Sequence, residues 1–280
     1  MNLPAHEVTT VAAALGDILR DPDARARLEA LALEIFGPGD RASGWFLRKL
    51  RREGVDGSLS SVLRERATGR VCGYMLVGPS RLQSNMVLGA GMGLSPDARG
   101  RGLGRALVAA TVTRLGRAGF TRLELPAEAT ARPFYERLGF HAQAPRETWL
   151  TYGCARPSAD ERRAAPAGPW KCASAAVELA GWREEAWIRT PPPKSTVRAA
   201  SAIAHFSREG RALLVQRLCV PEPVDPHVPA ALDMLRSLGA LGTPVLLYGV
   251  RPVSFITQHL RACCWSMAQR SFPMRRELHP

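Results

Sequence analysis

A glycine-rich run between an apolar stretch and an amphipathic helix is the sequence feature that most restricts how this chain folds. It reads Pro-Asp-Ala-Arg-Gly-Arg-Gly-Leu-Gly-Arg-Ala-Leu over residues 96–107. Apolar residues recur at helical spacing from there, at Leu103, Ala106, Leu107 and Ala110. That spacing predicts a helix with one buried face. Because glycine leaves main-chain N–H groups unobstructed and a helix N-terminus is partly positive, the run predicts a site for a pyrophosphate.

Two other phosphate-binding loops do not fit these residues. A P-loop requires Gly-Lys followed by Ser or Thr, but Arg105 and Ala106 stand at those places. A dinucleotide fingerprint counted from Gly100 and Gly102 requires a small residue at position 105, which is arginine. Nucleotide-triphosphate and dinucleotide sites of these types are therefore excluded here.

Two motifs resemble the GCN5-related N-acetyltransferases (GNAT). Arg-x-x-Gly-x-Gly, from Arg99 to Gly104, resembles the loop with which that family binds the pyrophosphate of coenzyme A. Residues 131–140, Ala-Arg-Pro-Phe-Tyr-Glu-Arg-Leu-Gly-Phe, resemble a later helix of the family that typically reads Phe-Tyr-Glu-Lys-Leu-Gly-Phe. The resemblance implies the GNAT fold, a mixed α/β domain, with acetyl-CoA as co-substrate. It assigns cofactor binding to Met92, Gly93, Leu94, Arg99, Gly100, Arg101, Gly102, Leu103, Gly104 and Arg105.

The strand expected at residues 86–94 contains Gly89, Gly91 and Gly93. Glycine inside a strand indicates a bulge or the close approach of another backbone or a ligand. In the family this strand splays from its neighbour, and the pantetheine arm bonds to its main chain in the gap. The resemblance therefore implies that residues 92–94 hold the pantetheine and polarise the acetyl carbonyl.

Tyr135 matches the family's tyrosine near the coenzyme sulfur. A phenol has a reference pKa near 10 and a thiol near 8.5, so a protonated tyrosine can donate to a departing thiolate at neutral pH. Packing within the core is the alternative role, and we expect Phe134 to be the packing residue of the pair.

Strand 86–94 has no carboxylate that could deprotonate the amine. Glu124 and Glu128 are the remaining candidates for a general base, and proton removal through water stays open.

The pattern of the first half predicts helices at residues 22–35, 45–52, 102–118 and 131–138. It predicts strands at 58–64, 71–77, 86–94 and 121–125, with final strands around 141–152. The second half repeats the order strand, strand, helix, strand, helix, strand, at residues 196–206, 212–220, 229–238, 245–248, 254–264 and around 274. This order predicts a degenerate GNAT-like copy. A segment rich in Ala, Pro, Ser and charge separates the halves. We therefore expect domains at residues 1–153 and 168–280 joined by a linker at 154–167.

The second copy lacks a glycine-rich loop. Residues 220–226 read Val-Pro-Glu-Pro-Val-Asp-Pro, so three prolines remove N–H donors and two carboxylates would repel phosphate. Binding of coenzyme A by the second half is not expected.

Charge and cysteine content limit the other classes of function. Only three of the 38 basic residues are lysines, Lys49, Lys171 and Lys194, and the net charge is +13. Codon composition in a GC-rich genome explains the arginine excess. The basic residues are scattered and lack interleaved aromatics, so nucleic-acid binding is not expected, whereas a positive field favours the polyanionic coenzyme.

The cysteines lack Cys-x-x-Cys spacing, which predicts free, buried thiols and no metal site. They are Cys72, Cys154, Cys172, Cys219, Cys263 and Cys264.

No apolar run approaches the length of about 18 residues that a membrane helix needs, and no signal peptide is recognised. We therefore expect a cytoplasmic protein that does not enter a membrane.

The leading hypothesis is an acetyl-CoA-dependent N-acetyltransferase acting on a primary amine that the sequence does not name. The alternative is a protein that binds or senses acyl-CoA without catalysis. The sequence leaves oligomerisation open.

Overall fold

The computed structural model describes residues 6–10, 22–37, 44–80, 83–153, 177–181, 195–199, 202–220, 227–252 and 254–279. The chain divides into two compact units. Unit 1 comprises Met1–Gln143 with Pro273–Pro280, and unit 2 comprises Ala144–Phe272. The expected linker at residues 154–167 and the proline-rich residues 221–226 lie outside the described residues.

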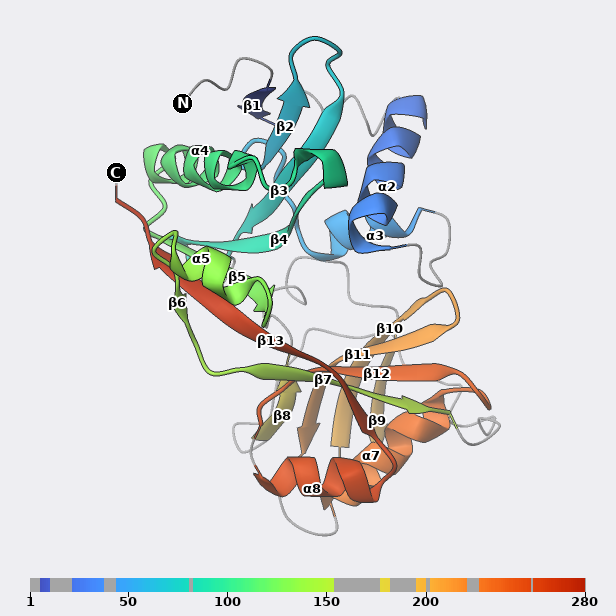
Figure 1. Cartoon of the computed structure of the whole chain (residues 1–280). Coiled ribbons are helices and arrows are strands. Elements are labelled where there is room, and N and C mark those ends of the chain that lie inside the picture. Colours follow the sequence, from blue (N-terminus) through green and yellow to red (C-terminus); the bar gives the residue numbers. More distant parts are fainter. Residues whose placement is uncertain are drawn as a thin grey trace. The chain divides into compact units, whose positions relative to one another are not determined.

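A mixed sheet forms the centre of unit 1, with the strand order β1-β2-β3-β4-β5-β13 (Figure 1). Strands β1, β2, β3 and β4 pair with one another in antiparallel order, whereas β4 pairs with β5 in parallel. Short strand β6 pairs with the C-terminal part of β13. The bounds are β1 His6–Thr10, β2 Ser61–Glu65, β3 Val71–Pro79, β4 Met86–Leu94, β5 Arg122–Glu128, β6 His141–Ala142 and β13 Ser266–Glu277.

Helices cover both faces of this sheet. On one face, α2 (Pro22–Phe36) and α3 (Trp45–Arg52) bury a core that includes Val62 of β2. On the other face lies α4 (Leu103–Arg117), whose Thr111 donates a hydrogen bond of 2.8 Å to Ser61. Because neighbouring residues of a strand point to opposite faces, Ser61 and Val62 place α4 opposite α2 and α3. Short helix α5 (Arg132–Glu136) follows β5.

Unit 2 has a sheet with the order β13-β7-β12-β8-β11-β10-β9, to which β13 contributes its N-terminal part. Helices α7 (His227–Leu238) and α8 (Ser254–Ala262) pack together, and their apolar residues share one buried cluster with the sheet. The strand bounds are β7 Arg146–Tyr152, β8 Val177–Gly181, β9 Ser195–Ala199, β10 Ala202–Glu209, β11 Ala212–Val220 and β12 Pro244–Val250.

The two compact units differ from the domains expected at residues 1–153 and 168–280. Strand β7 belongs to unit 2, where it pairs with β12. Residues 273–280 belong to unit 1, where Leu278 N–H donates to Thr121 O at 2.8 Å. β7 of the first half thus joins the unit 2 sheet, and the C-terminal part of β13 joins the unit 1 sheet. Local composition carries no signal of this exchange.

The expected repeat of elements is present in unit 2. Strands β10 and β11, helix α7, strand β12, helix α8 and strand β13 follow in the order predicted from the sequence. The strand expected at residues 196–206 is in fact two antiparallel strands, β9 and β10. Strands β1 and β8 were not predicted from the sequence.

The cysteines meet the expectation only in part. Cys72 and Cys219 are buried free thiols, whereas Cys263 is partly exposed and Cys264 is exposed, so burial of this pair was wrongly predicted. Both cysteines lie in the turn that follows α8, and Cys264 takes a left-handed conformation with φ of 59°. Cys154 and Cys172 lie outside the described residues. Within the described part of the chain, no helix is long and apolar enough to span a membrane.

Candidate functional site

The glycine-rich loop connects β4 to α4 and leaves room above the helix N-terminus. Gly100 and Gly102 have φ of 71° and 75°, a conformation that side chains disfavour, and a Cβ at either residue would meet no atom within 4 Å. Gly102 is the N-cap, and its carbonyl accepts the first helical bond from Ala106 N–H at 3.2 Å. The N–H groups of residues 103–105 precede that bond, so they are available to an anion.

Contacts to the preceding strands fix this loop. The carboxylate of Asp97 accepts hydrogen bonds from the Ser95 hydroxyl and the Arg70 guanidinium, which together lower the pKa of Asp97. Ser95 N–H donates to Cys72 O at 2.8 Å. Arg99 Nε donates to Leu94 O at 3.1 Å, so part of this predicted cofactor ligand is engaged in holding the loop. The loop is therefore preorganised.

Strands β4 and β5 separate beside this loop. They pair in parallel only from Met86 to Leu88 and from Arg122 to Glu124. Within the described residues, no strand pairs with the facing edges of β4 and β5 beyond these positions. Main-chain groups of residues 92–94 border the opening. An extended, amide-bearing group is the kind of ligand that such strand edges can hold.

Tyr135, Met92 and Gly104 come together where the loop, β4 and α5 meet. Tyr135 Oη donates to Met92 Sδ at 3.5 Å. A Cβ built on Gly104 would lie 3.4 Å from both Met92 Cε and Phe134 Cζ, and 3.5 Å from Leu94 Cδ1. Three segments that are distant in sequence therefore converge on one place, and each of them was predicted to touch the cofactor.

Tyr135 is the more buried aromatic residue of its pair. It is 7% exposed and makes edge-to-face contacts with Phe134 and Phe140 at centroid distances of 5.1 and 5.4 Å. Phe134 is only partly buried, so the expectation that it would be the packing residue was wrong. The five-residue helix turns Tyr135 toward β4. Burial raises the pKa of Tyr135 to about 12, which keeps the phenol protonated at neutral pH.

This pKa predicts a loss of stability in alkali that depends on Tyr135. The unfolded tyrosine ionises near pH 10, whereas the folded one resists ionisation up to about pH 12. The stabilisation is thus complete below pH 10 and is lost as the pH rises through 12, by about 2 to 3 kcal/mol in total. Urea unfolding between pH 8 and pH 12 should show a steeper decline for the wild type than for Tyr135→Phe. Parallel curves would contradict the assignment.

The two candidate bases have different surroundings. Glu124 Oε2 accepts hydrogen bonds from Arg275 Nε at 3.1 Å and from Arg275 Nη2 at 2.9 Å. Arg275 lies in β13, 151 residues further along the chain, so sequence reasoning had no signal for it. Glu128 is exposed at the last position of β5. The ion pair ties Glu124 to the neighbouring strand.

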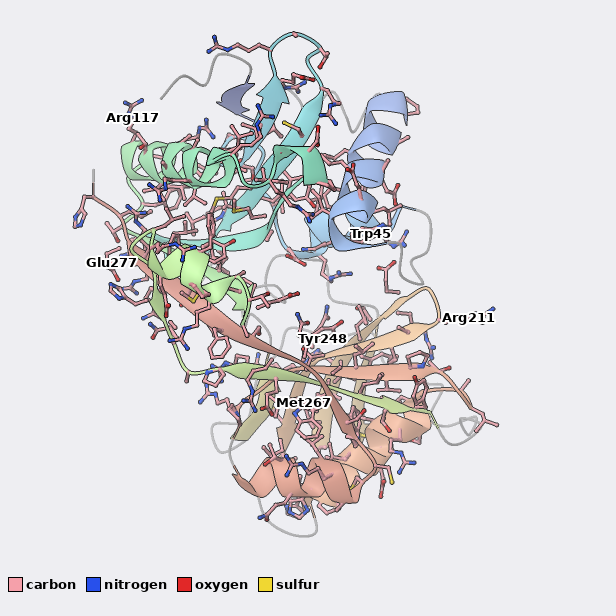
Figure 2. The ribbon with its side chains drawn as sticks, viewed as in Figure 1. Trp45, Arg117, Arg211, Tyr248, Met267 and Glu277 are labelled. Carbon is pink, nitrogen blue, oxygen red and sulfur yellow. The ribbon has the colours of Figure 1, made fainter. Side chains whose placement is uncertain are left out.

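Three large aromatic residues, Trp45, Phe46 and Trp149, are buried in two separate clusters. Trp45 and Phe46 of α3 belong to the core between α2, α3 and the unit 1 sheet, and Figure 2 labels Trp45 there. Trp149 belongs to the core of unit 2, where its Nε1 donates to Glu147 at 3.0 Å. Core packing therefore accounts for all three residues.

Unit 2 repeats the splayed strand pair but fills the opening. Strands β11 and β12 pair in parallel only over residues 213–215 and 245–247. Beyond this stretch β8 pairs with both, in antiparallel ladders that join Leu218 to Ala180 and Val250 to Ala180. β8 thus occupies in unit 2 the place that is open between β4 and β5 in unit 1.

Comparison with known proteins agrees with this geometry. Residues 58–142 match the acetyltransferase (GNAT) domain family. No curated protein sequence matches the chain. Solved structures match along nearly the whole length at 13% identity, which shows a shared fold. A candidate acetyltransferase from Pyrococcus horikoshii has a TM-score of 0.63, with 99% of this chain and 91% of that chain covered.

Two further structures have TM-scores of 0.60 at 13% identity. One is a GCN5-related N-acetyltransferase from Sphaerobacter thermophilus, with 100% of this chain and 98% of that chain covered. The other is a tandem GNAT protein from the clavulanic acid biosynthesis pathway, with 98% and 99% covered. The chain shares its fold with these two proteins. Residues 58–142 of the chain are therefore similar to a GNAT acetyltransferase domain.

Proposed function

We propose that unit 1 transfers an acetyl group from acetyl-CoA to a primary amine of an acceptor. The observation that carries this proposal is the convergence of Tyr135, Met92 and Gly104 beside the open N-terminus of α4. The N–H groups of residues 103–105 and the left-handed backbone at Gly100 and Gly102 suit a pyrophosphate. The edges of β4 and β5 suit the extended pantetheine arm that follows it.

The residues of the chain supply the groups that acyl transfer requires. Main-chain groups of residues 92–94 would hold the pantetheine arm and polarise the acetyl carbonyl while negative charge develops on its oxygen. As the amine nitrogen forms its bond to the carbonyl carbon and the carbon–sulfur bond breaks, Tyr135 Oη would donate a proton to the departing sulfur. The amine must lose one proton as the amide forms.

We assign the removal of that proton to a carboxylate at the end of β5. Glu128 lies beyond the part of β5 that pairs with β4 and is exposed, so it is accessible to an amine or to a bridging water. Glu124 also remains a candidate, but its ion pair with Arg275 stabilises it as a link between β5 and β13.

The internal comparison between the units supports the use of the β4–β5 opening. In unit 2 the corresponding edges bond to β8, an extended peptide segment. Pantetheine likewise presents amide N–H and C=O groups along an extended chain, so equivalent edges in unit 1 can bond it in a similar way.

We expect titration with acetyl-CoA to saturate at one molecule per chain, because β8 already occupies the opening in unit 2. Isothermal titration calorimetry of the full-length chain measures this stoichiometry directly. Two molecules per chain, or a coenzyme bound between β11 and β12 in a crystal structure, would contradict the expectation.

A transfer assay tests the proposed function. Acetyl-CoA would be incubated with the protein and a panel of primary amines, and release of the free thiol would be measured with and without each amine. Amine-dependent thiol release supports acetyl transfer. Tight binding of acetyl-CoA without transfer to any member of a broad panel would instead favour the acyl-CoA-sensing function. Absence of binding would overturn both.

A further inference from the structure

Strand β4 contains a β-bulge at Ala90, between its pairing with β5 and the residues that border the opening. Leu76 and Val77 of β3 are consecutive, but they pair with Gly91 and Gly89 respectively. Ala90 is therefore the extra residue on β4. Gly91 has φ of 146°, which a side chain would disfavour. A bulge bends its strand and disrupts the local ladder, so this one sets the direction of residues 91–94.

Lys49 of α3 fixes this bulge from the side. Its ammonium donates to Ala90 O at 2.5 Å, across 41 residues of sequence, and to Glu53 Oε1 at 2.7 Å. The side chains of Lys49 and Glu53 are only 19% and 2% exposed. Hydrogen bonds from a charged donor are stronger than neutral ones, and a partly buried setting strengthens them further. The ammonium thus links α3 to the bulge.

The composition of the chain makes a lysine at this position informative. Only three of the 38 basic residues are lysines, so arginine is used nearly everywhere. An ammonium is a compact charge that can serve two close acceptors, whereas a guanidinium is a broad planar fork. The single Lys49 nitrogen reaches both Ala90 O and Glu53 Oε1 at short distances, which suits an ammonium and not a guanidinium.

We propose that Lys49 is a positioning residue, which holds the Ala90 bulge so that residues 92–94 present their main chain to the thioester. This inference rests on the proposed function of unit 1. Met92 lies two residues beyond the bulge and contacts Tyr135, so a shift at Ala90 would move both the main-chain groups and the contact to the proposed proton donor. Misplacement of reacting groups by about 1 Å can cost on the order of a hundredfold in rate.

The decisive variant is Lys49→Met combined with Glu53→Gln. Removing Lys49 alone would leave the Glu53 carboxylate buried without this partner, which by itself destabilises the fold. The double variant removes both charges and keeps similar side-chain volumes. Glu53→Gln alone is the matched control, because it retains the bond from Lys49 to Ala90 O.

We expect the double variant to stay folded, with a higher KM for acetyl-CoA and a kcat lowered by about tenfold to a hundredfold. Glu53→Gln should remain within about twofold of the wild type in both constants. Lys49→Arg should resemble the double variant, because the broad planar guanidinium does not fit between the two close acceptors. A folded double variant with wild-type kinetics would overturn the inference.

Hydrogen exchange of the main-chain amides at residues 91–94 separates this inference from the proposed function. The amides should exchange faster in the double variant than in Glu53→Gln, whether or not acetyl-CoA is the ligand. Equal exchange in the two variants would refute the positioning role. Failure of the wild type to bind acetyl-CoA, with faster exchange still observed, would refute the proposed function alone.

Discussion

Replacing Gly102 with aspartate should abolish acetyl-CoA binding while leaving the fold intact. A Cβ at this position enters open space above the helix N-terminus, so the side chain would extend into the region proposed for the pyrophosphate. Its negative charge would repel the phosphates and would itself compete for the N–H groups of residues 103–105. Gly104→Glu should also prevent binding, but for a different reason. Gly104 is buried, and its Cβ would lie 3.4 Å from Met92 Cε and Phe134 Cζ, so the side chain would disturb this packing as well.

Two control variants separate this effect from backbone strain. Gly102→Ala imposes a side chain at φ of 75° without charge, and should cost about 1 kcal/mol of stability with weaker but measurable binding. Gly69→Asp introduces the same residue at φ of 69° in an exposed turn between β2 and β3, again with no atom within 4 Å of the Cβ. That control should bind as the wild type does.

Isothermal titration calorimetry gives the affinities, and circular dichroism checks the fold of each variant. We expect no measurable heat of binding for Gly102→Asp at concentrations that saturate the wild type. A well-folded Gly102→Asp protein with unchanged affinity would show that the pyrophosphate does not bind at this helix.

Tyr135→Phe should lower turnover by roughly tenfold to a thousandfold, the range for loss of a general acid, with nearly unchanged affinity for acetyl-CoA. The substitution keeps the ring contacts with Phe134 and Phe140 and removes only the hydroxyl that donates to Met92 Sδ. The loss should therefore appear in kcat and in kcat/KM together.

Tyr152→Phe provides a matched control for this substitution. Tyr152 is 56% exposed on β7 of unit 2, and removal of its hydroxyl should change neither constant. Steady-state kinetics with the acceptor found in the amine panel would decide the role of Tyr135. Turnover of Tyr135→Phe equal to that of the wild type would make Tyr135 a core aromatic residue and nothing more.

The local features of the proposed site could be predicted from the sequence. Strand β4 has the bounds expected for it, Met86–Leu94, and α4 begins and ends within one residue of the expected helix. These elements depend on glycine placement and on helical spacing, which are properties of neighbouring residues. The order of elements in unit 2 was predictable for the same reason.

The relation between the two halves could not be read from local pattern. The exchange of β7 and β13 and the insertion of β8 between β11 and β12 depend on pairing between distant segments. A strand's alternation predicts that it will pair, but not with which partner, because several edges offer equivalent main-chain groups.

The sequence by itself determined a glycine-rich helix N-terminus, a bulge-prone strand and a tyrosine motif, since each is encoded within a few residues. Only the tertiary structure decided the surroundings of the candidate side chains. It paired Glu124 with Arg275, buried Tyr135 more deeply than Phe134 and brought Lys49 to Ala90. Those contacts join residues far apart in the chain, and they form only when packing of the whole unit brings the backbone segments together.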